Sequence, residues 1–296
     1  MERIKTLIYL TERREKMENK LIINQIIPFS NVDGSGNRCA IFLQGCNISC
    51  IYCHNPETIN YCNDCGNCVN ACKYDAIHLV KSRIQYDKKL CTSCNACISI
   101  CPYNSSPKAI LYNVAELTEL IKQYKPFIRG ITISGGEPTL QKHLIIDLFN
   151  RIKPLGLTCT IDTNGFFDIN EMEDLINITD KFLFDVKTVD DSFKLCGVAN
   201  LSSLATLEYL LKKNKIEEVR TVVLNSYMDG KKTVEKVAQL LLNHLEVTYK
   251  IIKVHTLGLS KQRQNKINDF IPSDEEILEL VQIAKDLGLK KVEYVL

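Results

Sequence analysis

The fold is indicated most clearly by the stretch Gly130-Ile-Thr-Ile-Ser-Gly-Gly-Glu-Pro138 and by the residues that follow it. Its first half has the apolar, β-branched composition of a short buried strand. The next segment repeats apolar side chains at helical spacing, at Leu140, Leu144, Ile145, Leu148 and Ile152. That spacing predicts a helix with one apolar face. A strand followed directly by a helix is the repeating unit of a parallel sheet.

The same unit recurs further along the chain. Strands are predicted at residues 157–161, 181–186, 218–224 and 247–254, and helices near 201–213 and 232–243. A last helix opens on a capping box formed by Ser273 and Glu276 and ends at Gly288. Strand–helix units repeated about six times predict an α/β fold with right-handed crossovers. The sheet is either doubly wound or curled into a full or partial barrel.

Polar residues and glycines follow the predicted strands, where a core would contain Leu or Val. They are Gln44-Gly-Cys46, Ser134-Gly-Gly-Glu-Pro138, Asp162-Thr-Asn-Gly165, Asp185-Val-Lys187 and His255. In α/β folds, ligands bind at the carboxyl ends of the strands. We therefore expect one site built from several strand ends.

Composition narrows the range of partners. The 296 residues include 37 Lys and Arg against 35 Asp and Glu, a formal net charge of +2. This balance gives no electrostatic reason to expect nucleic acid or an anionic membrane as a partner. No apolar stretch approaches the ~20 residues of a membrane span. We expect a soluble, cytoplasmic monomer, with no nucleic-acid or membrane partner.

The chain has 14 cysteines, and eleven of them lie in three tight clusters within residues 46–101. Spacings of two and three residues hold sulfurs around a common point, which suits iron–sulfur ligation better than disulfides. The first cluster, Cys46-x3-Cys50-x2-Cys53, offers three thiolates to a cube of four irons and leaves one iron open for chemistry. Alternatives are a structural zinc site, or a cluster with Cys39 as the fourth ligand.

This three-cysteine motif resembles that of the radical S-adenosylmethionine (SAM) superfamily, and the resemblance covers residues 25–296. It implies a partial parallel (β/α)6 barrel, with Cys46, Cys50 and Cys53 as the catalytic cluster ligands. The open iron would be chelated by the amino and carboxylate groups of SAM. The segment Ser134-Gly135-Gly136-Glu137 resembles the superfamily motif that receives the methionyl amino group.

Two further strand ends, Asp162-Thr163-Asn164-Gly165 and Asp185-Val186-Lys187, resemble those of glycyl radical enzyme activases. The resemblance implies a monovalent cation, Na or K, beside SAM, held by Asp162, Thr163, Asp185 and backbone near Leu183. It further implies that residues at five positions contact the cofactor: Tyr52, Asp185, Lys187, Arg220 and His255.

The loop Asp33-Gly34-Ser35-Gly36-Asn37-Arg38 resembles the activase loop that receives the glycine-bearing loop of the partner enzyme. In this chain Ser35 replaces the usual proline. The substrate-loop residues implied by the resemblance are Asp33, Gly34 and Gly36.

The second and third cysteine clusters resemble a bacterial two-cluster ferredoxin. They are Cys62-x2-Cys65-x2-Cys68-x3-Cys72 and Cys91-x2-Cys94-x2-Cys97-x3-Cys101-Pro102. In that fold the fourth cysteine of each run ligates the other cube. The resemblance thus implies one 4Fe–4S cluster on Cys62, Cys65, Cys68 and Cys101, and another on Cys91, Cys94, Cys97 and Cys72. A pair of zinc knuckles is the alternative.

The expected organisation is an N-terminal extension at residues 1–20, a discontinuous barrel domain at 21–59 and 107–296, and a ferredoxin-like domain at 60–106. The segments Ile26-Ile27-Pro28-Phe29-Ser30 and Lys194-Leu195-Cys196-Gly197, together with the two ferredoxin-like cysteine runs, look most like those of YjjW-type activases. The implied function is cleavage of SAM to methionine and a 5'-deoxyadenosyl radical, which abstracts hydrogen from a glycine Cα of a partner enzyme. The expected electron donor is a flavodoxin or ferredoxin. The rivals are a radical SAM enzyme with a small-molecule substrate and a polyferredoxin that only transfers electrons.

Overall fold

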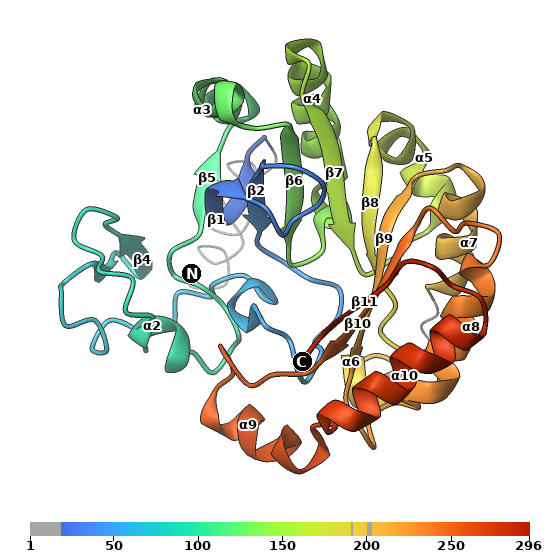
Figure 1. The fold of residues 1–296 in the computed structure, drawn as a ribbon. Helices are drawn as coiled ribbons and strands as arrows, with labels where there is room; N and C mark the ends of the chain where they lie inside the picture. Colours follow the sequence, from blue (N-terminus) through green and yellow to red (C-terminus); the bar gives the residue numbers. More distant parts are fainter. Residues whose placement is uncertain (1–18, 191, 200–202) are drawn as a thin grey trace.

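A computed structural model describes residues 19–190, 192–199 and 203–296 (Figure 1). Its nine-stranded sheet has the order β11-β10-β9-β8-β7-β6-β2-β1-β5. The run from β2 to β11 is parallel, and β1 and β5 extend it in antiparallel pairings. The strands are β1 Leu21–Ser30, β2 Arg38–Leu43, β5 Ile110–Tyr112, β6 Gly130–Gly135, β7 Thr158–Thr163, β8 Lys181–Asp185, β9 Ile216–Val223, β10 Thr248–Lys253 and β11 Val292–Val295. The expected mostly parallel α/β sheet is confirmed.

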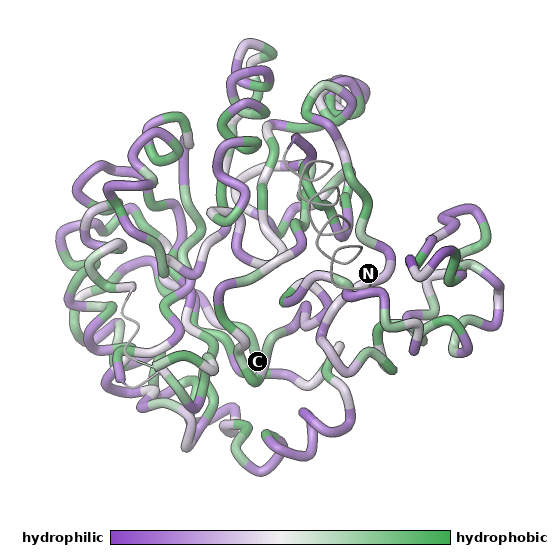
Figure 2. Tube along the Cα trace, turned by 180° about the vertical axis from the view of Figure 1, so that it is seen from behind, coloured by the Kyte–Doolittle hydropathy of each residue, from purple (hydrophilic) through white to green (hydrophobic). Residues whose placement is uncertain are grey.

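Helices cover the outer face of the curved sheet (Figure 1). They are α3 Val114–Tyr124, α4 Lys142–Ile152, α5 Ile169–Ile178, α7 Leu204–Lys212, α8 Gly230–Leu241 and α10 Asp274–Asp286. Two further helices, α6 Phe193–Cys196 and α9 Lys261–Ile267, pack instead against the loop that carries the first three cysteines. The predicted capping box of Ser273 and Glu276 is present at the start of α10. Hydrophobic and hydrophilic segments alternate along the outer helices, as amphipathic helices require (Figure 2).

The two faces of the sheet differ in chemistry. Outward residues such as Ile131 and Ile133 of β6 belong to the main core, together with Ile145 and Leu148 of α4. Successive side chains of a strand point to opposite faces. Thr132 and Ser134, which alternate with these two residues, therefore face the barrel interior. This alternation places the hydrophobic core between sheet and helices and leaves a polar interior.

The cysteine-rich segment projects from one side of the barrel, next to β5 (Figure 1). It contains the hairpin β3 Ile77–Val80 and β4 Arg83–Tyr86, and the short helix α2 Ala96–Ser99. Its two ends meet at Asn60 and Ser105, which form a β-bridge. The Asn60 side chain also donates a 2.8 Å hydrogen bond to the carbonyl of Tyr103. Of the predicted N-terminal extension, residues 1–18 lie outside the described residues. Among the described residues, no helix is long and apolar enough to cross a membrane.

A buried arginine joins β2, β6 and β7 inside the barrel, near the amino ends of these strands. Arg38 begins β2 and is 2% exposed. Its guanidinium donates hydrogen bonds to Thr132 Oγ1 of β6 at 2.7 Å and Thr160 Oγ1 of β7 at 2.8 Å. It also donates to the carbonyl oxygen of Ile131 at 2.6 Å. These bonds satisfy polar groups that the interior would otherwise leave unpaired.

Replacing Arg38 with Met should destabilise the fold by about 3 kcal/mol, because buried acceptors lose a charged donor. Urea unfolding under anaerobic conditions, followed by circular dichroism, measures this change. The matched control is Arg151→Met, which removes an exposed pair with Asp147 on α4. Arg151→Met should lower the free energy of unfolding by less than about 1 kcal/mol. Equal effects of the two substitutions would contradict a structural role for Arg38.

Candidate functional site

The first three cysteines lie on a loop that follows β2 and is pinned on both sides. The Gly45 and Cys46 amides donate hydrogen bonds to the carbonyls of Thr58 and Ile59, each 2.8 Å long. The Ser49 and Ile51 amides donate to the carbonyls of Cys196 and Leu195, at 2.8 and 2.9 Å. The loop is therefore held between the η1 turn (Pro56–Thr58) and the end of α6.

This loop and the carboxyl ends of the parallel strands enclose a cavity of about 630 Å³. Most of the residues singled out from the sequence line it: Cys46, Cys50, Tyr52, Cys53, Ser134, Gly135, Gly136, Asp162, Thr163, Asp185, Lys187, Arg220 and His255. Glu137, Asp33, Gly34 and Gly36 do not. Cys39 packs in the core with Ile131 and Ile133 and is not among the lining residues. The structure therefore does not support Cys39 as a fourth ligand.

The two glycines after β6 are required by close contacts. Gly135 has φ +108°, and a Cβ there would lie 2.3 Å from the Leu43 amide nitrogen. A Cβ on Gly136 would lie 1.9 Å from the Gly45 carbonyl oxygen. A side chain at Gly135 would push the end of β6 away from β2, and one at Gly136 would push it away from the cysteine loop.

Glu137 is buried, and its carboxylate is hydrogen-bonded by the protein itself. Its side chain is 1% exposed, and one carboxylate oxygen accepts hydrogen bonds from Thr139 Oγ1 at 2.8 Å and Thr163 Oγ1 at 2.9 Å. The other accepts a 3.0 Å bond from the Asn164 amide. Because the carboxylate is enclosed by these donors, it ties the ends of β6 and β7 together rather than facing the cavity.

Four charged residues on the cavity wall pair with one another. Arg220 donates to Asp185 Oδ1 at 2.8 Å and contacts Asp162, and Lys187 donates to Asp185 Oδ2 at 2.7 Å. Burial and the nearby Asp185 raise the pKa of Asp162 to about 6, although Arg220 opposes this. At Asp185, burial is outweighed by Arg220 and Lys187, which lower the pKa to about 2. A monovalent cation at the two aspartates would have to share them with Arg220.

Two buried polar atoms beside the cysteines have no hydrogen-bond partner among the described residues: Tyr52 Oη and His54 Nε2. His54 stacks on His255 with ring centroids 3.7 Å apart. Burial and His255 lower the pKa of His54 to about 4, which keeps it neutral. Orphaned polar atoms in a wall that also presents three thiols fit a polar cofactor together with a cluster. His54 was missed in the sequence, although it directly follows the motif.

The predicted substrate loop closes the interior from the opposite end of the strands. The Ser35 amide and hydroxyl donate to Glu217 Oε1 of β9, at 2.7 and 2.8 Å. The neighbouring residue Val32 lines the cavity. The loop therefore borders the site through Val32, while Asp33, Gly34 and Gly36 stand back from it.

The eight remaining clustered cysteines gather around two small cavities in the projecting segment. One is lined by Cys72, Cys91, Cys94 and Cys97, and the other by Cys62, Cys65, Cys68 and Cys101, with Cys97 also at its edge. Among the described residues, no three His, Cys, Asp or Glu side chains are arranged to hold a single metal ion.

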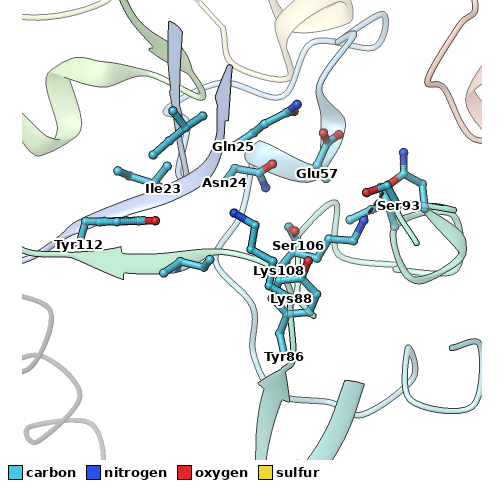
Figure 3. Close-up of a pocket in the computed structure, with 14 residues that line it drawn as sticks. Ile23, Asn24, Gln25, Glu57, Tyr86, Lys88, Ser93, Ser106, Lys108 and Tyr112 are labelled. Carbon is cyan, nitrogen blue, oxygen red and sulfur yellow. Dashed lines mark hydrogen bonds between the residues drawn. The ribbon is translucent and has the colours of Figure 1, made fainter. Parts of the chain in front are cut away.

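A further cavity of about 300 Å³ separates this segment from the edge of the barrel (Figure 3). Lys88 and Lys108 lie on its wall with Tyr86, opposite Asn24 and Glu57. Asn95 and Lys108 line both this cavity and the small cavity of Cys72, Cys91, Cys94 and Cys97. The cavity thus adjoins one of the two cysteine sets.

Comparison with known proteins agrees with this geometry. A sequence profile described as the radical SAM superfamily matches residues 40–197. A putative glycyl-radical enzyme activating enzyme of Haemophilus influenzae is 36% identical, over 91% of this chain and 95% of that protein. The trans-4-hydroxy-L-proline dehydratase activating enzyme of Clostridioides difficile is 31% identical, over 90% of this chain and 96% of its own length.

A solved structure with a similar fold is QueE from Escherichia coli. Its TM-score is 0.50 at 14% identity, and the match covers 95% of this chain and 97% of that chain. At this identity the likeness concerns the fold alone. With the profile match and the two sequence relatives, the conclusion is that this chain belongs to the radical SAM superfamily and, within it, to the glycyl-radical enzyme activating enzymes.

Proposed function

We propose that this protein activates a glycyl radical enzyme, using a 4Fe–4S cluster on Cys46, Cys50 and Cys53. The observation that carries the proposal is that these three thiols line one cavity with the polar strand ends. With the cluster and SAM bound there, one electron from an external donor, passed through the cluster to SAM, would give methionine and a 5'-deoxyadenosyl radical, and this radical would take a hydrogen atom from a glycine Cα of the partner. The relatives that are named activating enzymes support this reading.

Different residues of the cavity wall would bind the ammonium, the carboxylate and the adenosine part of SAM. The backbone of Gly135 and Gly136 and the Ser134 hydroxyl can accept hydrogen bonds from the methionyl ammonium, because no side chain separates them from the cavity. Lys187 and Arg220 are the cations available to the methionyl carboxylate. The orphaned Tyr52 hydroxyl and the stacked pair of His54 and His255 are left for the adenosine part. A monovalent cation would join Asp162 and Asp185 beside the carboxylate.

The two alternative functions, electron transfer by a polyferredoxin and radical SAM chemistry on a small molecule, explain fewer features of this site. A polyferredoxin has no need of the paired glycines, the charged strand ends or a cavity of about 630 Å³ beside three thiols. A radical SAM enzyme with a small-molecule substrate would share the first step. Val32 lines the cavity, is 81% exposed and stands next to a loop that resembles the activase substrate loop, which favours a protein substrate.

Replacing Cys46, Cys50 and Cys53 together with Ala should remove one cluster and all SAM cleavage. We expect about twelve iron and twelve sulfide per reconstituted chain, and about eight of each in the variant, because the other two cysteine sets are unchanged. Metal and sulfide analysis and 5'-deoxyadenosine release measure both effects. Cys39→Ala, which truncates a buried thiol outside the cavity, is the control and should leave both at the wild-type level. Continued SAM cleavage by the triple variant would disprove the assignment.

We propose further that residues 60–106 form a ferredoxin-like domain with two 4Fe–4S clusters, which passes electrons to the active-site cluster. The sorting of eight cysteines into two sets of four, each around its own cavity, supports two cubes. The pairing at Asn60 and Ser105 supports a position close to the active site, since Asn60 lies seven residues after Cys53. The donor is proposed to be a flavodoxin or ferredoxin.

Replacing Cys94 and Cys97 with Ala should slow SAM cleavage strongly when a reduced flavodoxin or ferredoxin supplies electrons. The loss should be much smaller with dithionite, a small reductant that can reach the active-site cluster directly. The two rates are compared in protein shown to be folded and to retain the active-site cluster. An equal loss with both reductants would contradict the relay and favour a docking role for the domain.

A further inference from the structure

A buried serine at the end of the projecting segment has a hydroxyl group with no hydrogen-bond partner among the described residues. Ser105 is 2% exposed, and its Oγ atom is both buried and unpaired. The same residue lines the small cavity of Cys62, Cys65, Cys68 and Cys101. Buried hydroxyl groups in folded proteins are normally hydrogen-bonded, because an unpaired one has lost its water without a replacement. The hydroxyl of Ser105 is therefore available to a group that occupies this cavity.

The backbone around Ser105 fixes the direction of its side chain. Ser105 forms a β-bridge with Asn60, and the Asn60 amide donates a 3.0 Å hydrogen bond to the carbonyl of Asn104. Successive side chains of an extended segment point to opposite sides. Accordingly, Ser105 lines the cavity of the four cysteines, whereas Ser106 lines the larger cavity beside the barrel.

The residue that holds Ser105 is itself held by the barrel. The carbonyl of Asn60 accepts a 2.5 Å hydrogen bond from Gln44 Nε2, directly after β2. The preceding carbonyl, that of Ile59, accepts a 2.8 Å bond from the Cys46 amide. The hydroxyl is thus presented to the cavity by backbone that is joined to the catalytic cysteine loop.

The chemistry of this cavity decides which way a hydrogen bond from the serine runs. The four thiols that line it fit a 4Fe–4S cluster, whose sulfide and thiolate sulfurs can only accept hydrogen bonds. The hydroxyl of Ser105 carries a hydrogen to donate. Hydrogen bonds to the sulfurs of a cluster favour its more negative, reduced state and thereby raise its reduction potential.

We propose that the Ser105 hydroxyl donates a hydrogen bond to a sulfur of the cluster on Cys62, Cys65, Cys68 and Cys101, and thereby raises the reduction potential of that cluster. The proposal rests on the ferredoxin-like domain proposed above, and not on the identity of the partner enzyme. A higher potential makes it easier for an external donor to reduce this cluster. A serine that only fills space would leave the potential unchanged.

The test is a redox titration of the reconstituted full chain, followed by electron paramagnetic resonance. The signal of this cluster is the one that Cys65→Ala removes or alters and Cys94→Ala retains. Ser105→Ala removes the donor and should shift the midpoint of that signal to a more negative potential. The control is Ser106→Ala, which removes a hydroxyl from a residue that is also 2% exposed. That hydroxyl accepts a 3.1 Å hydrogen bond from the Lys108 amide, and its removal should leave the midpoint at the wild-type value.

Ser105→Thr and Ser105→Val form a second matched pair, which carries the test if Ser105→Ala does not assemble the cluster. Both add volume at the same position, but only Thr keeps the hydroxyl. The midpoint should therefore stay closer to the wild-type value in Ser105→Thr than in Ser105→Val.

Two results would overturn the role of Ser105. One is a wild-type midpoint in Ser105→Ala or Ser105→Val with full iron content, and the other is an equal shift in Ser106→Ala. A wild-type chain that holds only about four iron, the content of one 4Fe–4S cluster, would instead disprove the ferredoxin-like domain. The failure of this proposal and the failure of the proposed domain are therefore distinguishable.

Discussion

The site depends on one close approach between backbones, where the end of β6 meets the cysteine loop. The Gly136 amide donates to the Leu43 carbonyl at 3.0 Å, and the Glu137 amide donates to the Gly45 carbonyl at 2.8 Å. Glycine alone allows this contact, because a Cβ at Gly136 would lie 1.9 Å from the Gly45 oxygen. Through it, the loop with the three cysteines and the strand end proposed to hold SAM become one rigid unit.

The rest of the barrel supplies charge to this unit. The alternation along each strand sends apolar residues outward to the helices and polar residues inward. Near the amino ends of the parallel strands, Arg38 donates hydrogen bonds to the interior hydroxyls of Thr132 and Thr160. At the carboxyl ends, four charged side chains form salt bridges with one another: Asp162, Asp185, Lys187 and Arg220. Each charge is held by an opposite one, so the wall can bind a zwitterionic ligand without an unpaired buried charge.

Much of the fold and of the cavity wall was predictable, because these features depend on residues that are close together in the sequence. The strand–helix alternation, the polar strand ends and the cysteine spacing each appear within a few consecutive residues. Partners distant in sequence were not predictable. The carboxylate of Glu137 accepts hydrogen bonds from Thr163 at the end of β7 and from Asn164 after it. The carbonyls of Leu195 and Cys196 accept hydrogen bonds from the cysteine loop, because α6 packs against that loop. The edge strand β11 was also missed, because its Val-Glu-Tyr-Val sequence is short and mixes charge with apolar residues.

The central claim, that this protein places a radical on a partner enzyme, is tested most directly by electron paramagnetic resonance. A partner glycyl radical enzyme is incubated anaerobically with this protein, SAM and a reductant. The account predicts a glycine Cα radical on the partner, absent when the partner's glycine is replaced by Ala and absent with the triple cysteine variant. Release of 5'-deoxyadenosine with a metabolite, and no radical on the partner, would contradict it.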